Sequence, residues 1–220
     1  MSEEKYKTLI LSSRGVSHQQ RHLVSELLRL LPNSQKEVKV DRKKHPGIIQ
    51  ELLEKNACNQ VLYLETKGKV TVLWAGKYPE GPSIKFLLQN IRTSEELKMP
   101  GNCSKRNRHV VSFDSSFSKD NLLKVVKEML TQLFAVPKNI ERVQGAVDRI
   151  IGFSSIESKI FFRNFEVLDG NEITEIGPRF VLTVVKVMSG FMQNDVLYTN
   201  GKYLGNKSKP KKPKFEGIDN

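Results

Sequence analysis

The chain places a glycine–proline pair directly before an apolar run at two widely separated points. Gly81-Pro82 leads into residues 83–91, and Gly177-Pro178 leads into residues 179–187. Glycine has no Cβ, and proline fixes φ and donates no backbone hydrogen bond, so the pair suits a turn at the start of a strand. A basic residue follows each corner closely, Lys85 in the first run and Arg179 in the second. The repetition is explained if the architecture around the corner is itself repeated.

The elements expected around the two corners occur in the same order. Residues 1–104 predict a strand, a helix, a charged connector, a short helix, a hairpin and a last strand, at 7–13, 18–31, 36–44, 46–53, 60–66 with 69–76, and 83–91. Residues 105–204 predict a strand, a helix, a helical piece, a hairpin and a last strand, at 108–114, 120–133, 139–148, 149–155 with 159–168, and 179–187. Ser17 and Gln20 have the spacing of a capping box, and Asp120 or Ser118 is expected to cap the second long helix.

This order predicts an α/β fold of two pseudo-repeated halves, each a mixed sheet with helices. The expected boundaries are an N-terminal half at 1–104, a C-terminal half at 105–204 and a basic tail at 205–220. Chance similarity between two common α/β patterns is the competing explanation. The tail interleaves lysines and prolines with almost no apolar residues, so we expect it to be disordered.

The charge balance indicates a polyanionic partner. Lys and Arg number 36 against 24 Asp and Glu, a formal net charge of +12. Nucleic acid is the leading candidate, because no long basic amphipathic helix favours a membrane surface. A merely basic protein without such a partner is the alternative. The longest apolar run, 180–188, contains Lys186 and is too short to span a bilayer, and no secretory signal is recognisable, so two unpaired cysteines in a reducing compartment are expected.

The sequence offers no constellation for catalysis, metal or cofactor. His18 and His22 stand at i, i+4 but lack the glutamate of a zinc-protease motif and an apparent third ligand. Neither of the glycine-rich phosphate-binding motifs is present. The prediction is a binding protein rather than an enzyme, with no cofactor, no metal and no small-molecule substrate.

Clustered basic residues are the candidate contacts to phosphate. They are Lys36, Lys39, Arg42, Lys43 and Lys44 in the connector, Lys105, Arg106 and Arg108 before the second half, and Lys207, Lys209, Lys211 and Lys212 in the tail. The tail cluster is read as an import signal, a phosphate-binding arm or a solubilising segment. Arg179 has two possible partners, an external anion or Glu172 or Glu175 beside it. Five aromatic residues stand at strand spacing, where core packing is favoured over stacking on bases: Tyr63, Trp74, Tyr78, Phe161 and Phe162.

Several stretches together resemble the Brix-domain family of ribosome assembly proteins, over roughly residues 8–204. They are "LILSSRGVSHQQRHLVSELLRLLPNS" (9–34), "EGPSIKFLLQNIRTSEELKMPGNC" (80–103), "VVSFD" (110–114), "FFRNFEV" (161–167) and "EIGPRFVLTVVKV" (175–187). Within the family the sequence is most similar to the branch that assembles the large subunit. The phrases "SSRGV" and "NIRTSEELKMPGNC" carry that similarity.

The resemblance implies two halves similar to the anticodon-binding domain of class IIa aminoacyl-tRNA synthetases. It also implies a nuclear, nucleolar protein without enzymatic activity that binds precursor rRNA of the large (60S) subunit. RNA contacts are then expected at an exposed N-terminal stretch with Ser13 and Arg14, at the connector and near Arg179, with Gly81-Pro82 and Gly177-Pro178 as equivalent corners. Lys85, after the first corner, is a further candidate contact. The expected partners are that rRNA, other pre-60S assembly factors and ribosomal proteins. A protein-interaction scaffold that makes few RNA contacts is the alternative, and a free-standing tRNA-binding module is a weaker one.

Overall fold

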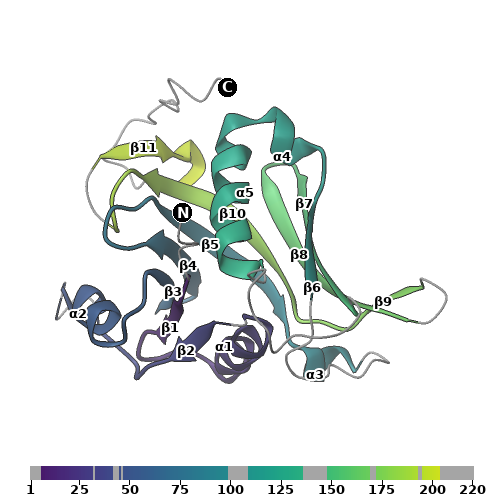
Figure 1. The fold of residues 1–220 in the computed structure, drawn as a ribbon, viewed down its shortest axis with the longest axis horizontal. Helices are drawn as coiled ribbons and strands as arrows, with labels where there is room; N and C mark the ends of the chain where they lie inside the picture. Colours follow the sequence, from purple (N-terminus) through teal and green to yellow (C-terminus); the bar gives the residue numbers. More distant parts are fainter. Residues whose placement is uncertain are drawn as a thin grey trace, which may run out of the picture.

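A computed structural model describes residues 6–31, 33–41, 45, 47–98, 109–135, 148–168, 172–192 and 195–203. It contains one large mixed sheet flanked by helices (Figure 1). The first part of the chain forms β1 (Thr8–Ser12), α1 (His18–Leu30), β2 (Ser34–Lys36), α2 (Ile48–Lys55), β3 (Gln60–Lys67), β4 (Val70–Lys77), β5 (Ser83–Arg92) and α3 (Ser94–Leu97). The second part forms β6 (His109–Phe113), α4 (Ser116–Lys119), α5 (Asn121–Phe134), β7 (Arg149–Ile156), β8 (Lys159–Val167), β9 (Ile173–Glu175), β10 (Arg179–Met188), β11 (Val196–Thr199) and a 3₁₀-helix (Gly201–Tyr203).

The strand order along the sheet is β2-β1-β3-β4-β5-β10-β8-β7-β6, with β11 paired to β10 and β9 paired to β8. In the first half β1 and β3 are parallel, and β3, β4 and β5 follow as antiparallel neighbours. In the second half β6 and β7 are parallel, and β7, β8 and β10 follow as antiparallel neighbours. The two sets meet where β5 pairs antiparallel with β10 in the middle of the sheet.

Local signals in the sequence predicted most of these elements correctly. Both hairpins form, with Lys67 opposite Val70 and Ile156 opposite Lys159. The capping box of Ser17 and Gln20 forms at the start of α1. The Asp120 carboxylate caps the start of α5 by accepting hydrogen bonds from the first-turn N–H groups. The short elements β2, α3, α4, β9 and β11 were not expected. The helical piece at 139–148 lies outside the described residues except for its last position, as does the tail at 205–220.

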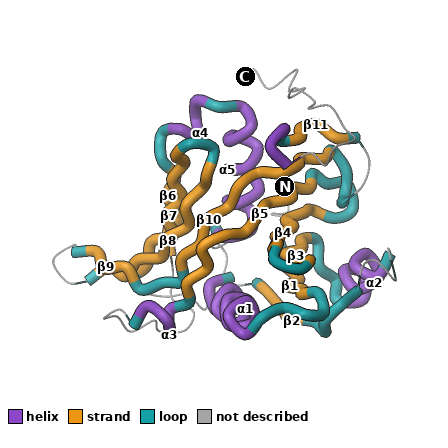
Figure 2. Tube along the Cα trace, turned by 180° about the vertical axis from the view of Figure 1, so that it is seen from behind, coloured by secondary structure: helices purple, strands orange, loops and turns teal. Residues whose placement is uncertain are grey.

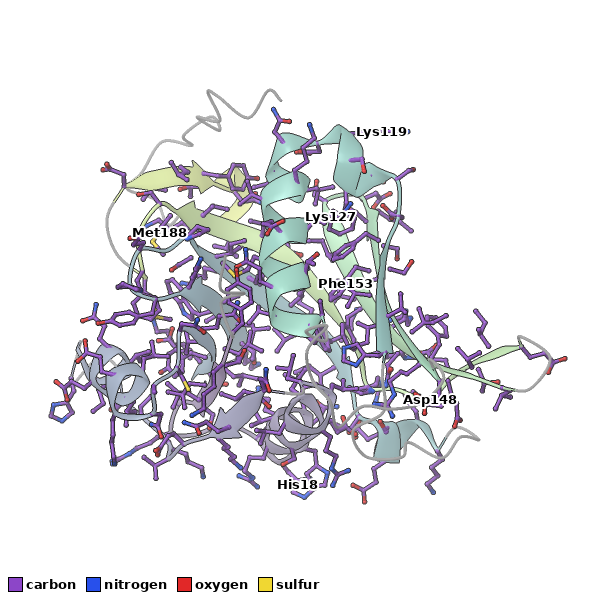
Figure 3. All side chains as sticks on the ribbon, in the orientation of Figure 1. His18, Lys119, Lys127, Asp148, Phe153 and Met188 are labelled. Atoms are coloured by element: carbon purple, nitrogen blue, oxygen red, sulfur yellow. The ribbon has the colours of Figure 1, made fainter. Side chains whose placement is uncertain are left out.

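Two hydrophobic clusters lie on opposite faces of the sheet because strand side chains alternate. On one face α1 and α5 cover residues from both halves, such as Leu62, Phe86, Phe162 and Phe180. On the other face α2 packs with residues such as Val61, and Met188, Phe191 and Met192 from the second half join the same cluster. Figure 2, seen from behind, shows β5, β10 and β8 in front of α5 without a described helix over them. Figure 3 shows Phe153 of the shared cluster close behind α5.

The two glycine–proline corners lie at opposite ends of the β5–β10 pair, and each glycine contacts the segment that follows the other strand. Gly81 has φ +93°, and a Cβ there would lie 2.3 Å from the backbone oxygen of Ser189, just after β10. Gly177 has φ +72°, and a Cβ there would lie 2.9 Å from a methyl group of Leu97, in the helix after β5. Only glycine fits both the left-handed backbone and the close approach. The two corners therefore fix the relative position of the central strands.

Candidate nucleic-acid interface

Three arginines surround a hollow at the end of the central strands. The hollow has a volume of about 640 Å³ and is lined by Gln19, Asn90, Ile91, Arg92, Phe161, Arg163, Arg179 and Val181. These residues come from α1, β5, β8 and β10, and most lie on the sheet face opposite α5. The hollow is open to solvent, and its volume is comparable with that of small-ligand sites.

Strand register brings these residues together. On β10, Phe180 and Leu182 point into the core under α5, so Arg179 and Val181 face the opposite side. Val181 is the direct neighbour of Phe161 on β8, and Arg179 is the neighbour of Arg92 on β5. Side chains of residues far apart in the sequence thereby line one hollow.

An irregularity in β5 places Arg92 at the hollow. The β5–β10 register shifts between Arg179 and Val181, and Asn90 adopts a positive φ of 51° at that point. Before the shift, Phe86 and Leu88 point into the core. After it, Ile91 packs against the same core, so the alternation has slipped by one residue. Arg92 is left exposed beside the opposite arginine.

A single carboxylate positions two of the arginines. Glu175 lies 3.7 Å from Arg163 Nε through one oxygen and 3.7 Å from Arg179 NH1 through the other. Its side chain is only 20% exposed, whereas those of Arg163 and Arg179 are 31% and 35% exposed. The carboxylate is therefore more deeply buried than the two cations that it holds. Three guanidinium groups and one carboxylate leave the hollow positively charged, so it favours an anion.

The corner before β10 is held by a buried asparagine. Asn164 Nδ2 donates to the carbonyl oxygen of Gly177 at 2.6 Å, and the N–H of Ile176 donates to the carbonyl oxygen of Asn164 at 2.9 Å. Asn164 has no exposed surface. Since Arg179 follows this corner directly, the asparagine determines where its side chain leaves the backbone.

Gln19 of α1 lines the opposite wall of the hollow and is held by β5 and α3. Gln19 Nε2 donates to the carbonyl oxygen of Ile91 and to the carboxylate of Glu96, each at 2.9 Å. The hydrogen bond from Gln19 is the main cause that lowers the pKa of Glu96, and the charge of Arg92 lowers it further. Among the described residues Arg92 has no carboxylate at ion-pair distance, so its charge is available to a ligand.

The sequence matches a known protein family over most of its length. The family model described as "Brix domain" matches residues 13–186, which is most of the chain. The chain belongs to the Brix-domain family. The family resemblance inferred from the sequence motifs is therefore confirmed.

Curated Brix-domain relatives cover nearly the whole chain. The "Ribosome biogenesis protein BRX1 homolog" of Xenopus laevis is 42% identical over 203 residues, which cover 91% of this chain and 60% of the relative. The human protein of the same name is 40% identical over 91% of this chain and 58% of its own length. "Ribosome biogenesis protein BRX1" of Saccharomyces cerevisiae is 39% identical over 91% of this chain and 74% of its own length. The chain thus spans about three fifths of the vertebrate relatives.

A solved structure shares the fold. The "probable ribosomal biogenesis protein from Aeropyrum pernix K1" aligns with 81% of this chain and 96% of its own, with a TM-score of 0.54 at 14% identity. At that identity the likeness concerns the fold alone. It supports a mixed α/β architecture for this Brix domain.

The Brix domain brings only some of the predicted contact residues to the hollow. Arg179 lines the hollow. Its predicted partner was an external anion or one of the two acids Glu172 and Glu175, and in the structure it pairs with Glu175. Lys85 lies on the other central strand, with its Nζ 5.1 Å from the ring centre of Trp74. Lys36 is exposed at the end of β2, the outermost strand at the far end of the sheet order, and Lys39 is exposed just after it. The remaining predicted residues lie outside the described ones: Arg42, Lys43, Lys44, Lys105, Arg106, Arg108, Lys207, Lys209, Lys211 and Lys212.

The expectation that Ser13 lies on an exposed stretch is wrong. Ser13 is 8% exposed, and its hydroxyl accepts a hydrogen bond from the backbone N–H of Thr66 at 3.0 Å. It extends the parallel pairing of β1 and β3, which explains its burial. Arg14, the next residue, is exposed. Both line a smaller crevice of about 190 Å³ at the carboxyl ends of these strands, together with Asp41, Glu65 and Lys67.

The aromatic residues divide as the strand alternation requires. Tyr63, Trp74 and Phe162 are buried, in agreement with the preference for core packing. Phe161 is only half-buried, lines the hollow and carries the guanidinium of Arg163 5.8 Å from its ring centre. Arg92 and Arg163 were not among the residues predicted from the sequence. Phe161 and Arg163 alternate with the core residues of β8, and this alternation would have indicated Arg163 as a neighbour of Phe161 on the outer face. The shift in register that exposes Arg92 has no signal in the sequence.

The described residues contain no group of three or more His, Cys, Asp or Glu side chains that could hold a metal ion. The ring centres of His18 and His22 lie 4.1 Å apart, and His22 Nδ1 lies 2.9 Å from a Glu95 oxygen. His18 projects from the start of α1 at the outer edge of the molecule (Figure 3). In the part of the chain that is described, no helix has the length and apolar character needed to span a membrane.

Proposed function

We propose that this Brix-domain protein acts in ribosome biogenesis by binding precursor rRNA of the large subunit in the nucleolus, without catalysing a reaction. Its relatives carry the name of ribosome biogenesis proteins, and the motifs of the chain resemble the large-subunit branch of the family. The observation that carries the RNA contact is the hollow with Arg92, Arg163 and Arg179, on a part of the sheet over which the described residues place no helix. Its proposed partners are that rRNA, other pre-60S assembly factors and ribosomal proteins.

Electrostatics supports RNA as the ligand. A net charge of +12 attracts a polyanion over the whole surface, and the hollow adds guanidinium groups that suit phosphate oxygens. Each phosphate that an arginine neutralises releases counterions, so the affinity should fall steeply with salt. Phosphate contacts would supply most of the affinity, and the shape of the RNA would supply the selectivity.

We also propose that the two halves are pseudo-repeats, each similar to an anticodon-binding domain. Three observations support the repeat. Both halves pair their main strands as one parallel and two antiparallel neighbours. Both place a long helix, α1 or α5, on the same face of the sheet. Both enter their last strand through a glycine–proline corner with positive glycine φ.

The alternative function is a scaffold for acidic or apolar protein partners. It is favoured by the projection formed by the end of β8 and β9 (Figure 1). Leu168 and Ile173 on this projection are 41% and 57% exposed, although both are large apolar side chains. Exposed apolar residues on a projecting hairpin suit a protein contact better than an RNA contact.

Crosslinking in cells, followed by sequencing of the attached RNA, tests the proposed function. Reads concentrated in large-subunit precursor rRNA would support it. Reads in small-subunit precursor rRNA would overturn the assignment to the large subunit. Background recovery from a protein that still sediments with pre-ribosomes would favour the scaffold.

A variant of the three arginines and a control on the other face of the sheet test the hollow itself. Replacing Arg92, Arg163 and Arg179 by Gln removes three charges but retains hydrogen-bond donors for Glu175. The control replaces Lys119 and Lys124 by Ala, two exposed cations of α4 and α5 on the other face of the sheet. In a salt titration we expect the arginine variant to lose about one unit of salt slope for each phosphate contact removed, while the control keeps nearly the full slope. Equal effects would exclude the hollow as the RNA site.

A further inference from the structure

Phe161 gives the hollow a chemistry that phosphate binding does not require. Its ring is half-buried on the face of β8 opposite α5, and beside it Val181 forms an apolar floor that is 4% exposed. A site for phosphate alone would need cations and N–H donors, not an aromatic ring. Phe161 lines the hollow and the described residues place no helix over it, so part of its side chain is accessible from the hollow.

The guanidinium of Arg163 lies over the ring of Phe161 and adds a second flat group to the hollow. Its guanidinium carbon lies 5.8 Å from the ring centre of Phe161, and one of its terminal nitrogens donates to the carbonyl oxygen of Phe162 at 3.2 Å. Glu175 holds the guanidinium from the other side. Aromatic rings and arginine planes are the groups on which unpaired bases stack in RNA complexes.

Polar side chains lie around this flat surface, on the neighbouring strands β5 and β10. Arg92 and Arg179 are opposite neighbours on β5 and β10, where a phosphate can contact both. Asn90 is exposed in its left-handed turn, and within the described part of the chain no hydrogen bond occupies its side-chain amide. An amide of this kind can donate to and accept from the edge of a base.

We propose that the hollow binds an unpaired nucleotide of RNA, with the base stacked on Phe161 and Arg163 and the phosphate held by Arg92 and Arg179. This inference rests on the proposed RNA binding and adds the class of RNA that the site selects. In an A-form duplex the bases are stacked within the helix, so a base reaches Phe161 only from a bulge, a loop or a single strand. The protein then prefers RNA with an unpaired nucleotide to a continuous duplex.

The test uses the full chain and three RNA probes of matched composition: a short blunt duplex, the same duplex with a single-nucleotide bulge, and a single strand. The variant Phe161→Leu keeps an apolar side chain but removes the ring, and Phe161→Tyr keeps the ring. Phe165→Leu is the control, because Phe165 lies on the same face of β8 but packs over Gly152 and does not line the hollow.

We expect Phe161→Leu to weaken binding of the bulged duplex and the single strand by about 5- to 150-fold, which corresponds to the loss of one stacked base. Binding of the blunt duplex should change little, and Phe161→Tyr and Phe165→Leu should bind all probes like the wild type. Equal losses for Phe161→Leu and Phe165→Leu, or equal losses on all three probes, would overturn the stacking. If Phe161→Leu binds normally while the triple arginine variant does not, RNA binding stands and the unpaired-nucleotide site is wrong. If the wild type binds none of the probes, both proposals fail.

Discussion

Substituting Gly81 by Ala tests whether the glycine–proline corner fixes the central strands. Two costs add at this position. A residue with a Cβ in the left-handed region costs about 1–2 kcal/mol. The new Cβ would also lie 2.3 Å from Ser189 O and 2.7 Å from the carbonyl carbon of Gly190, so the backbone after β10 must move. Forcing an extra methyl group into a packed site costs about 1–3 kcal/mol. The expected loss in the free energy of unfolding is therefore about 2–5 kcal/mol.

The backbone that would have to move continues directly into residues that are packed and hydrogen-bonded. A small movement that removes the clash is therefore not expected. The N–H of Met192 donates to the hydroxyl of the buried Ser83 at 2.8 Å, and the Phe191 ring lies edge-on to Tyr78 at 5.2 Å. Moving Ser189 and Gly190 disturbs both contacts.

Gly15→Ala is the matched control for the backbone cost. Gly15 has a similar φ of +83°, but a Cβ there would have no heavy atom within 4 Å. Its expected cost is only the left-handed term of about 1–2 kcal/mol. For a protein of this size each kcal/mol lowers Tm by roughly 2–4 °C, so circular dichroism melting curves should separate the two variants. Equal Tm values for Gly81→Ala and Gly15→Ala would refute the claim that the contact with the segment after β10 matters.

Three further changes test other contacts. Asp120→Ala removes the cap of α5 and should cost about 1 kcal/mol in urea unfolding, whereas Asp120→Asn keeps the acceptor and most of the stability; equal losses would argue against the cap. Burial is the main cause that raises the pKa of Glu26, whose carboxylate accepts from the N–H of Ser94 at 2.8 Å. The stability linked to Glu26 is therefore present at acidic pH and is lost as pH rises through the raised pKa, so the wild type should lose stability relative to Glu26→Gln over that range; parallel stability–pH curves would contradict the raised pKa. Phe162→Ala removes a fully buried ring stacked 4.3 Å from Phe180 and should cost about 3–5 kcal/mol in the same unfolding assay, and a cost below that of Asp120→Ala would show that the shared core is not where we place it.

The elements that sequence reasoning predicted correctly are those whose signal is local. The capping box of Ser17 and Gln20 involves residues three apart, and the structure contains both of its hydrogen bonds. The turn at Gly68 joins strands that are adjacent in the sequence. In such cases the interacting residues are close together in the sequence, so the element can be predicted from one sequence alone.

The candidate site was predicted only in part, because its residues meet through strand register. Arg179 was recognised from its place after the second corner. Arg92 was missed because its orientation depends on the slip at Asn90, which adapts β5 to its neighbour. Ser13 was expected on an exposed stretch, but it continues the pairing of β1 with β3 and is buried by it.

By itself the sequence determined the family, the alternation of strands and helices, the two corners and the strongly basic charge, since each of these is carried by residue identity or short spacing. Only the tertiary structure decided that β5 and β10 are neighbours and that α1 and α5 cover one continuous core. It also decided that Arg92, Phe161, Arg163 and Arg179 share one hollow. The physical reason is that hydrophobic periodicity tells which face of a strand is buried but not which strand lies beside it. That choice is made by the packing of the whole sheet.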